Sequence, residues 1–209
     1  MKKYITEFIG TFFLVLTIGM AVNGGAGAMA PIAIGAVLMV MVYAGCHMSG
    51  GHYNPAVTLA VLIRGKITVG RAIPYMVSQV IGATVAAFVV KYLIGEEKMP
   101  AAAVANPTAI KALIAELLGT FALAHVVLHV GTAKANANNN FFGLAIGFTV
   151  TAMAYALGNI SGGAFNPAVA VGISCMKMAA WGDIWIYVAG CFGGAALAAI
   201  VFNMSKEED

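Results

Sequence analysis

Charged side chains are scarce in this sequence. Only 8 acidic and 11 basic residues occur among 209, while apolar residues make up 61% of the chain. Soluble domains carry a charged fraction near a quarter, so this chain has too few charges to cover a water-facing surface. The cations are also scattered along the chain, which excludes the basic patch of a nucleic-acid-binding protein. We therefore expect a membrane protein whose partner is the lipid bilayer, with no nucleic-acid partner.

Cysteine is equally sparse and follows no metal-site pattern. Cys46, Cys175 and Cys191 lie in apolar or glycine-rich runs without CxxC or Cys/His spacing, which argues against a zinc site and a disulfide framework. His125 and His129 stand four residues apart, but no carboxylate or cysteine shares their face, so packing is favoured over metal binding. We predict no metal, no cofactor and no enzyme activity.

Six apolar stretches are long enough to cross a membrane, which takes about 20 residues. They cover residues 4–22, 31–49, 69–92, 108–130, 141–159 and 182–203. Basic residues favour one side of this topology by seven to four, so we expect a multi-pass protein of the cell membrane with both termini in the cytoplasm. The seven are Lys2, Lys3, Arg64, Lys66, Arg71, Lys134 and Lys206; the four are Lys91, Lys98, Lys111 and Lys177.

Two further apolar stretches, residues 54–63 and 166–176, are too short to cross, and each begins with Asn-Pro. Asn is a favoured N-cap and Pro suits the first helical position, so both stretches are predicted to be half-helices. Non-helical backbone at membrane depth is tolerated only where it is buried in protein or lines a wet cavity. The sequence therefore predicts such a cavity.

The two halves of the chain repeat one another. Residues 6–14 (TEFIGTFFL) match residues 115–123 (AELLGTFAL), and residues 49–57 (SGGHYNPAV) match residues 161–169 (SGGAFNPAV). Each half holds three spans, an odd number, so the second copy enters the membrane from the opposite side. We expect one domain, residues 1–209, built from inverted repeats 1–100 and 101–209, with the half-helix N-termini meeting near the midplane.

The paired Asn-Pro-Ala motifs suggest a passive pore. Helix dipoles place partial positive charge at both tips, which repels cations. The Asn amides are expected to point N–H donors into the lumen, and the backbone before each motif to offer it carbonyl oxygens. The motif residues are Asn54, Pro55, Ala56, Asn166, Pro167 and Ala168; the carbonyls are those of Gly50, Gly51, His52, Tyr53, Gly162, Ala164 and Phe165.

Three titratable residues in the repeated segments have alternative interpretations. Glu7 and Glu116 are costly within a membrane unless paired, and a proton relay is one interpretation of such residues. Their duplicated ExxGT frame favours a structural role instead, in which each carboxylate accepts N–H groups of the irregular backbone before a half-helix. His52 is expected near the cytoplasmic vestibule, with pH modulation as an alternative to a plain structural role.

The two SGGxxNPAV frames, the two ExxGT boxes and the segment 79–83 (QVIGA) resemble the major intrinsic protein family, the aquaporins and glycerol facilitators, over residues 7–195. The resemblance implies an all-α fold of six tilted transmembrane helices plus two half-helices, in a right-handed bundle around one pore. It also implies a homotetramer.

The resemblance places the narrowest constriction at Ile34, Ala154, Gly163 and Val169. Most water channels have Arg at the last position, whereas Val stands here, as in some tonoplast intrinsic proteins. We expect a wide apolar filter that passes water and small uncharged solutes by passive diffusion. The alternatives are a channel that favours ammonia, glycerol or urea over water, a coupled secondary transporter, and a structural membrane protein with a closed pore. The sequence does not decide whether the filter leaks ions or whether residues 135–140 gate the pore.

Overall fold

Six long helices form the body of the computed structural model, which describes residues 1–99 and 108–205. They are α1 (Lys2–Asn23), α2 (Ala30–Ser49), α4 (Val69–Ile94), α5 (Ala109–Thr132), α6 (Phe142–Ser161) and α8 (Ile184–Ser205). All six are long and apolar enough to span a membrane. Each predicted span agrees with its helix to within about two residues, because the apolar runs and their breaks are unambiguous. The predicted repeat boundary at residues 100 and 101, and Lys206, lie outside the described residues.

Two short helices complete the repeat pattern, α3 (Pro55–Ile63) and α7 (Pro167–Cys175). These are the half-helices that the two Asn-Pro motifs predict. Single 3₁₀ turns occupy the connections: η1 (Gly27–Met29), η2 (Glu96–Lys98), η3 (Lys134–Asn136) and η4 (Trp181–Asp183).

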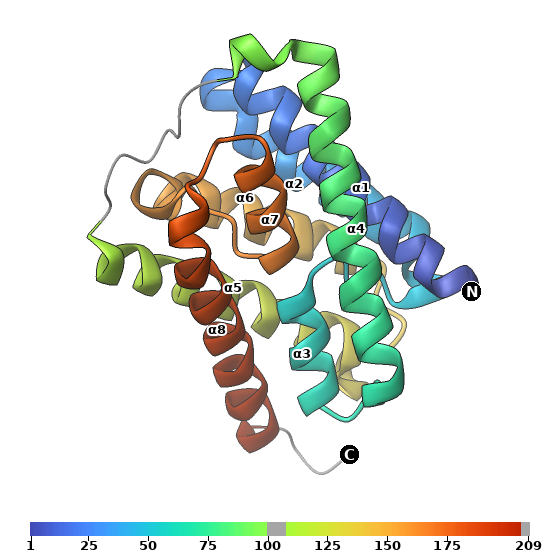
Figure 1. The fold of residues 1–209 in the computed structure, drawn as a ribbon. Helices are drawn as coiled ribbons and strands as arrows, with labels where there is room; N and C mark the ends of the chain where they lie inside the picture. Colours follow the sequence, from blue (N-terminus) through green and yellow to red (C-terminus); the bar gives the residue numbers. More distant parts are fainter. Residues whose placement is uncertain (100–107, 206–209) are drawn as a thin grey trace.

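The helices pack in a pattern that is the same in both halves. The first and third long helices of each half are in extensive contact, α1 with α4 and α5 with α8, while α2 crosses α6. Each half-helix packs against the third long helix of the other half, α3 against α8 and α7 against α4 (Figure 1). The two halves therefore interlock around a shared centre.

Small residues allow the closest of these contacts. A methyl group on Gly82 of α4 would meet the backbone of Phe8 and Phe12 of α1. Gly194 of α8, which occupies the equivalent position, would meet the backbone of Leu117 and Phe121 of α5 in the same way. Without a hydrophobic force between helices in lipid, such close backbone approach supplies much of the packing energy.

The polar connection after α5 caps the end of that helix and contacts α2. Asn136 Nδ2 donates to His129 O at 3.1 Å, and Asn139 Nδ2 donates to Val130 O at 2.8 Å. These bonds satisfy carbonyls of the last turn of α5, which have no partner within the helix. Tyr43 of α2 donates its hydroxyl to Asn140 O at 3.1 Å, so the connection is also tied to a second helix.

Candidate functional site

Each half-helix starts at an asparagine that caps it. Asn54 Oδ1 accepts the N–H groups of Ala56 at 2.8 Å and Val57 at 3.4 Å. Asn166 Oδ1 does the same for Ala168 at 2.9 Å and Val169 at 3.4 Å. Both asparagines have extended backbone and are followed by Pro at the first helical position. The two starts are therefore built alike.

The two tips meet, and the same asparagines join them. Asn54 Nδ2 donates to Phe165 O at 2.9 Å, and Asn166 Nδ2 donates to Tyr53 O at 2.9 Å. This exchange of hydrogen bonds across the pseudo-two-fold axis holds α3 and α7 tip to tip. An asparagine amide has two N–H donors, so one donor of each Asn is used here and one is left over.

This contact changes one expectation from the sequence. The Tyr53 and Phe165 carbonyls, predicted to be free for solute, each already accept an asparagine amide. A carbonyl oxygen has two lone pairs, so each keeps one for a further donor. The sequence does not show this, since the partner comes from the other repeat.

A buried carboxylate organises the backbone before each half-helix. Glu7 accepts His52 N at 3.0 Å and Tyr53 N at 2.7 Å, and Glu116 accepts Ala164 N at 3.0 Å and Phe165 N at 2.7 Å. The hydroxyls of Ser49 and Ser161 each add a bond of 2.6 Å. This is the arrangement that the duplicated ExxGT frame favours.

The backbone that these carboxylates hold is strained in the same way in both halves. Tyr53 and Phe165 have φ values of 49° and 48°, in a region that side chains with a Cβ rarely adopt. Their rings cover Gly10 and Gly119, where a methyl group would collide with them. The carboxylate bonds and the ring packing together keep each residue in this conformation.

The third long helices supply a further donor, and here the halves differ. Gln79 Nε2 donates to Glu7 Oε2 at 2.7 Å. The residue that lies 112 positions later is Cys191, whose thiol approaches Glu116 Oε2 at 3.5 Å. Because a thiol is a weak donor, Glu116 is held less firmly than Glu7.

His52 belongs to a network that exists only in the first half. The Thr58 hydroxyl donates to Asn54 O at 2.9 Å and accepts Gln79 Nε2 at 3.1 Å. His52 Nδ1 lies 3.1 Å from the same hydroxyl oxygen. Since the single hydroxyl proton is already used, Nδ1 donates to this oxygen, and in a neutral ring Nε2 is then the acceptor. The equivalent positions in the second half are Ala164 and Ala170.

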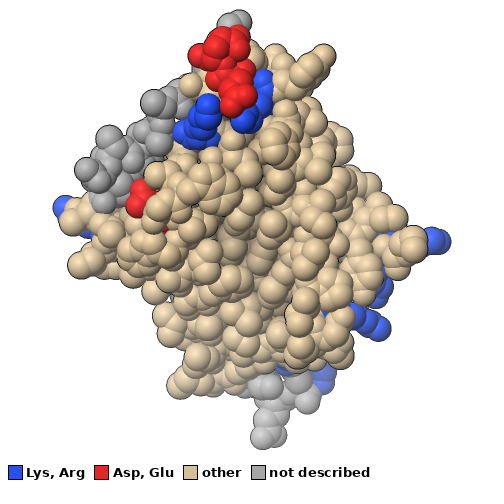
Figure 2. All heavy atoms as spheres, in the orientation of Figure 1, with Lys and Arg blue, Asp and Glu red and all other residues tan. Residues whose placement is uncertain are grey.

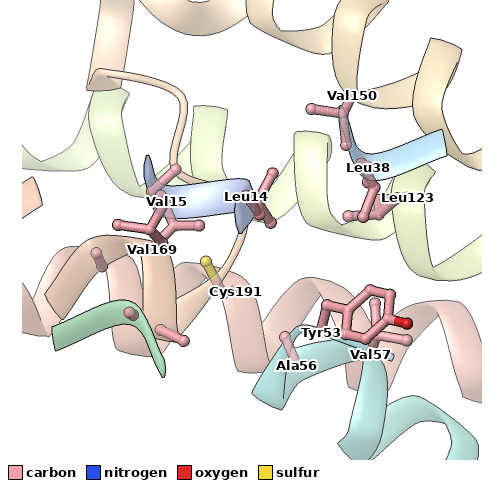
Figure 3. Packing of buried hydrophobic residues seen from close by; sticks show 14 of the residues in the cluster. Leu14, Val15, Leu38, Tyr53, Ala56, Val57, Leu123, Val150, Val169 and Cys191 are labelled. Atoms are coloured by element: carbon pink, nitrogen blue, oxygen red, sulfur yellow. The ribbon is translucent and has the colours of Figure 1, made fainter. Parts of the chain in front are cut away.

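A cavity of about 680 Å³ runs past the meeting point of the tips. Both asparagines line it, as do the four predicted filter residues, Ile34, Ala154, Gly163 and Val169. Apolar side chains of the long helices also line the cavity; Figure 3 shows Leu14, Leu38, Leu123 and Val150, which come from four different long helices. Of the predicted carbonyl residues, Gly51, His52, Tyr53, Gly162, Ala164 and Phe165 line the cavity and Gly50 does not.

The remaining candidates lie away from the cavity lining. The His125 and His129 rings are 4.4 Å apart, with Phe121 stacked on His125 and Phe202 against His129. No group of three metal-ligating side chains occurs within residues 1–99 and 108–205. The histidines thus sit in an aromatic cluster.

Two tyrosines that are not among the predicted site residues also take part in the site. Tyr75 donates its hydroxyl to Ser49 O at 2.9 Å, and Tyr187 donates to Ser161 O at 2.7 Å. Both bonds fix the last residue of a long helix beside the turn into a half-helix. A comparison of the halves at the spacing of 112 residues would have found this pair, as it finds Gln79 and Cys191.

Fold and site together define a multi-pass membrane protein whose interior cavity runs past the meeting point of two half-helix tips. The family described as "Major intrinsic protein" matches residues 1–202. The chain belongs to this family.

Known relatives agree with that assignment. The chain is 35% identical over 217 residues to "Glycerol uptake facilitator protein-like 6" of Lactiplantibacillus plantarum, with 100% of both chains covered. It is 34% identical to "Aquaporin TIP1-1" of Arabidopsis thaliana, covering 98% of this chain and 86% of that one. The solved structure of the aquaglyceroporin from Plasmodium falciparum has the same fold, with a TM-score of 0.81 at 20% identity, covering 98% and 96% of the two chains.

Proposed function

We propose that this protein is a passive channel for water and small uncharged solutes. The observation that carries the proposal is the reciprocal bond between Asn54 and Phe165 and between Asn166 and Tyr53, at a point that the cavity passes. Each Asn there has one N–H donor left for the oxygen of a solute. Membership of the major intrinsic protein family, whose members are channels and not enzymes, supports the same function.

Exclusion of cations follows from the direction of the half-helices. The N-termini of α3 and α7 face one another, and neither first turn contains an acidic residue. Each terminus is equivalent to about half a positive charge in a surrounding of low dielectric constant. A cation therefore meets two repulsive ends, whereas a neutral solute meets donors and acceptors.

The filter is proposed to be wide and apolar, formed by Ile34, Ala154, Gly163 and Val169. None of the described residues that line the cavity is Asp, Glu, Lys or Arg. The lining does include one histidine, His52, but its Nδ1 is bonded to Thr58. Coupled transporters bind ions and protons at such groups near the membrane midplane, so a lining without carboxylate or cationic side chains supports passive passage. The absence of a cationic side chain also supports passage of ammonia and of neutral solutes larger than water, such as glycerol or urea.

The remaining parts of the proposal concern assembly and placement. We propose one domain of two inverted repeats, residues 1–100 and 101–209, assembled as a homotetramer. We further propose that it lies in the cell membrane with both termini in the cytoplasm. Cross-linking in membranes and protease access to tags on the termini would test assembly and orientation.

Stopped-flow swelling of proteoliposomes tests the proposed function. The wild-type protein should pass water and a panel of small neutral solutes. Their rates should not change when a sodium or pH gradient is imposed. Val169→Arg should reduce the passage of larger solutes and of any ions, because it adds bulk and charge at the filter. Val169→Leu is the steric control and should keep ion passage unchanged. Solute flux that depends on a sodium or proton gradient would contradict the proposal.

A further inference from the structure

The two ends of the helix bundle differ in charge. Lys2 and Lys3 begin α1, Lys66 and Arg71 flank the start of α4, and Lys134 follows α5; all five are exposed. The start of α1 lies beside the start of α4, because the Tyr4 and Tyr75 rings are 5.7 Å apart. The end of α2 lies there too, since Tyr75 bonds Ser49 O.

No acidic side chain within the described ranges is exposed at this end. Glu7 and Glu116 are fully buried, and the other described acidic residues, Glu96, Glu97 and Asp183, lie in connections at the opposite end. At that opposite end Lys91 and Lys177 pair with Glu96 at 2.8 and 3.1 Å. In Figure 2 red atoms lie against blue ones along the upper edge, while the blue atoms at the right have no red beside them.

Apolar side chains continue from these cations along α1 and α4. Ile5 and Ile9 project from α1 with 51% and 43% of their surface exposed, and Ile73 and Val77 project from α4 with 58% and 52% exposed. Exposed cations above exposed aliphatic side chains match the two parts of a phospholipid, a charged headgroup and its acyl chains. Lys and Arg stems can lie along apolar surface while their charges reach the headgroup level.

We infer that the corner formed by Lys2, Lys3, Lys66 and Arg71 is a binding site for an anionic phospholipid. The cations hold the headgroup phosphate, and Ile5, Ile9, Ile73 and Val77 contact the acyl chains. A zwitterionic headgroup has no net charge and is not attracted by the excess of positive charge. The site therefore selects anionic over zwitterionic lipid. Each cation near an anionic lipid surface strengthens binding by roughly fivefold.

Competition between lipids on the intact protein tests this site. Spin-labelled phosphatidylglycerol and spin-labelled phosphatidylcholine are compared for association with the full-length protein in phosphatidylcholine vesicles. The wild type should prefer phosphatidylglycerol, and high salt should weaken the preference because it screens exposed charges. Lys3→Gln with Arg71→Gln should reduce the preference by roughly tenfold or more.

The matched control removes the same number of exposed cations from the opposite end, Lys111→Gln with Lys177→Gln, and should keep the preference. Size-exclusion elution and water flux confirm that both variants are folded. Equal preferences in the wild type and the Lys3/Arg71 variant would overturn the site, as would an equal loss in the control. Residues 206–209 include three acidic residues, which could themselves pair with the cations. If the preference for phosphatidylglycerol appears only after these residues are removed, this segment occupies the site in the full chain, and the proposal is overturned.

Discussion

At the scale of single residues, the conformation of the pore backbone depends on two buried carboxylates. Glu7 accepts four hydrogen bonds, from two backbone N–H groups, the Ser49 hydroxyl and the Gln79 amide. Glu116 accepts the same set except that a thiol replaces the amide. A carboxyl group at membrane depth is costly to bury, and the donors around each of these two reduce that cost.

Replacing either carboxylate with its amide should destabilise the protein. In Glu7→Gln an N–H donor takes the place of an acceptor oxygen and faces other donors, which costs about 2–3 kcal/mol. Glu116→Gln should cost less, since the thiol of Cys191 is a weak partner. Unfolding temperatures in detergent show which of the two variants is less stable. Glu97→Gln, at an exposed position, is the control. A larger loss for Glu116→Gln than for Glu7→Gln would contradict this account.

At this scale, local features could be predicted from the sequence, whereas contacts between the two repeats could not. The N-caps at Asn54 and Asn166 follow from residue type and neighbours. The bonds to Phe165 O and Tyr53 O do not, because the partner lies more than a hundred residues away. The tautomer of His52 likewise depends on Gln79 and Thr58, which only the fold brings together.

At the scale of elements, helix packing depends on glycines that bring backbones together. Gly82→Ala should destabilise the contact between α1 and α4 by about 1–3 kcal/mol, because the added methyl meets the Phe8 backbone, which cannot move as a side chain can. Gly70→Ala in the same helix is the control, since nothing lies within 4 Å of its added carbon. Thermal unfolding should show a lower midpoint for Gly82→Ala than for the wild type, and an unchanged or higher one for Gly70→Ala. Equal midpoints of the two variants would show that the contact between α1 and α4 has room for the added methyl group.

An ion-pair cluster joins α4, η2 and the connection after α7 at one end of the bundle. Lys91 of α4 and Lys177, just after α7, both bond Glu96 of η2, and these bonds hold the pKa of the Glu96 carboxyl below its usual value. Since the folded pKa is lowered, the stabilisation is present above the unfolded pKa and is lost as the pH falls through the folded pKa.

Glu96→Gln should therefore lower the unfolding temperature slightly at neutral pH, and the difference from the wild type should vanish as the pH falls through the lowered pKa of the Glu96 carboxyl. High salt should shrink the difference at neutral pH, because the carboxylate is exposed. Unfolding temperatures across pH and salt provide the measurement. A difference that persists unchanged in acid would rule out the ionised carboxylate as its cause.

At the scale of the whole molecule, the duplication produces the passage. Each half contributes one half-helix, and each half-helix packs on a long helix of the other half. The number of spans, the half-helices and their inverted relation could be predicted because they follow from apolar length and from the matching frames. The cavity's lining could be predicted only in part: the filter positions and most carbonyl residues line it, whereas Gly50 does not.

Water flux through two tryptophan variants shows whether water crosses the membrane through this cavity. Ala154 lines the cavity at the proposed filter, while Ala156, two residues along α6, is exposed on the outside. Stopped-flow shrinkage of proteoliposomes with equal protein content should show that Ala154→Trp loses nearly all protein-dependent water flux and that Ala156→Trp keeps it. Undiminished flux in folded Ala154→Trp would mean that water does not pass through this cavity.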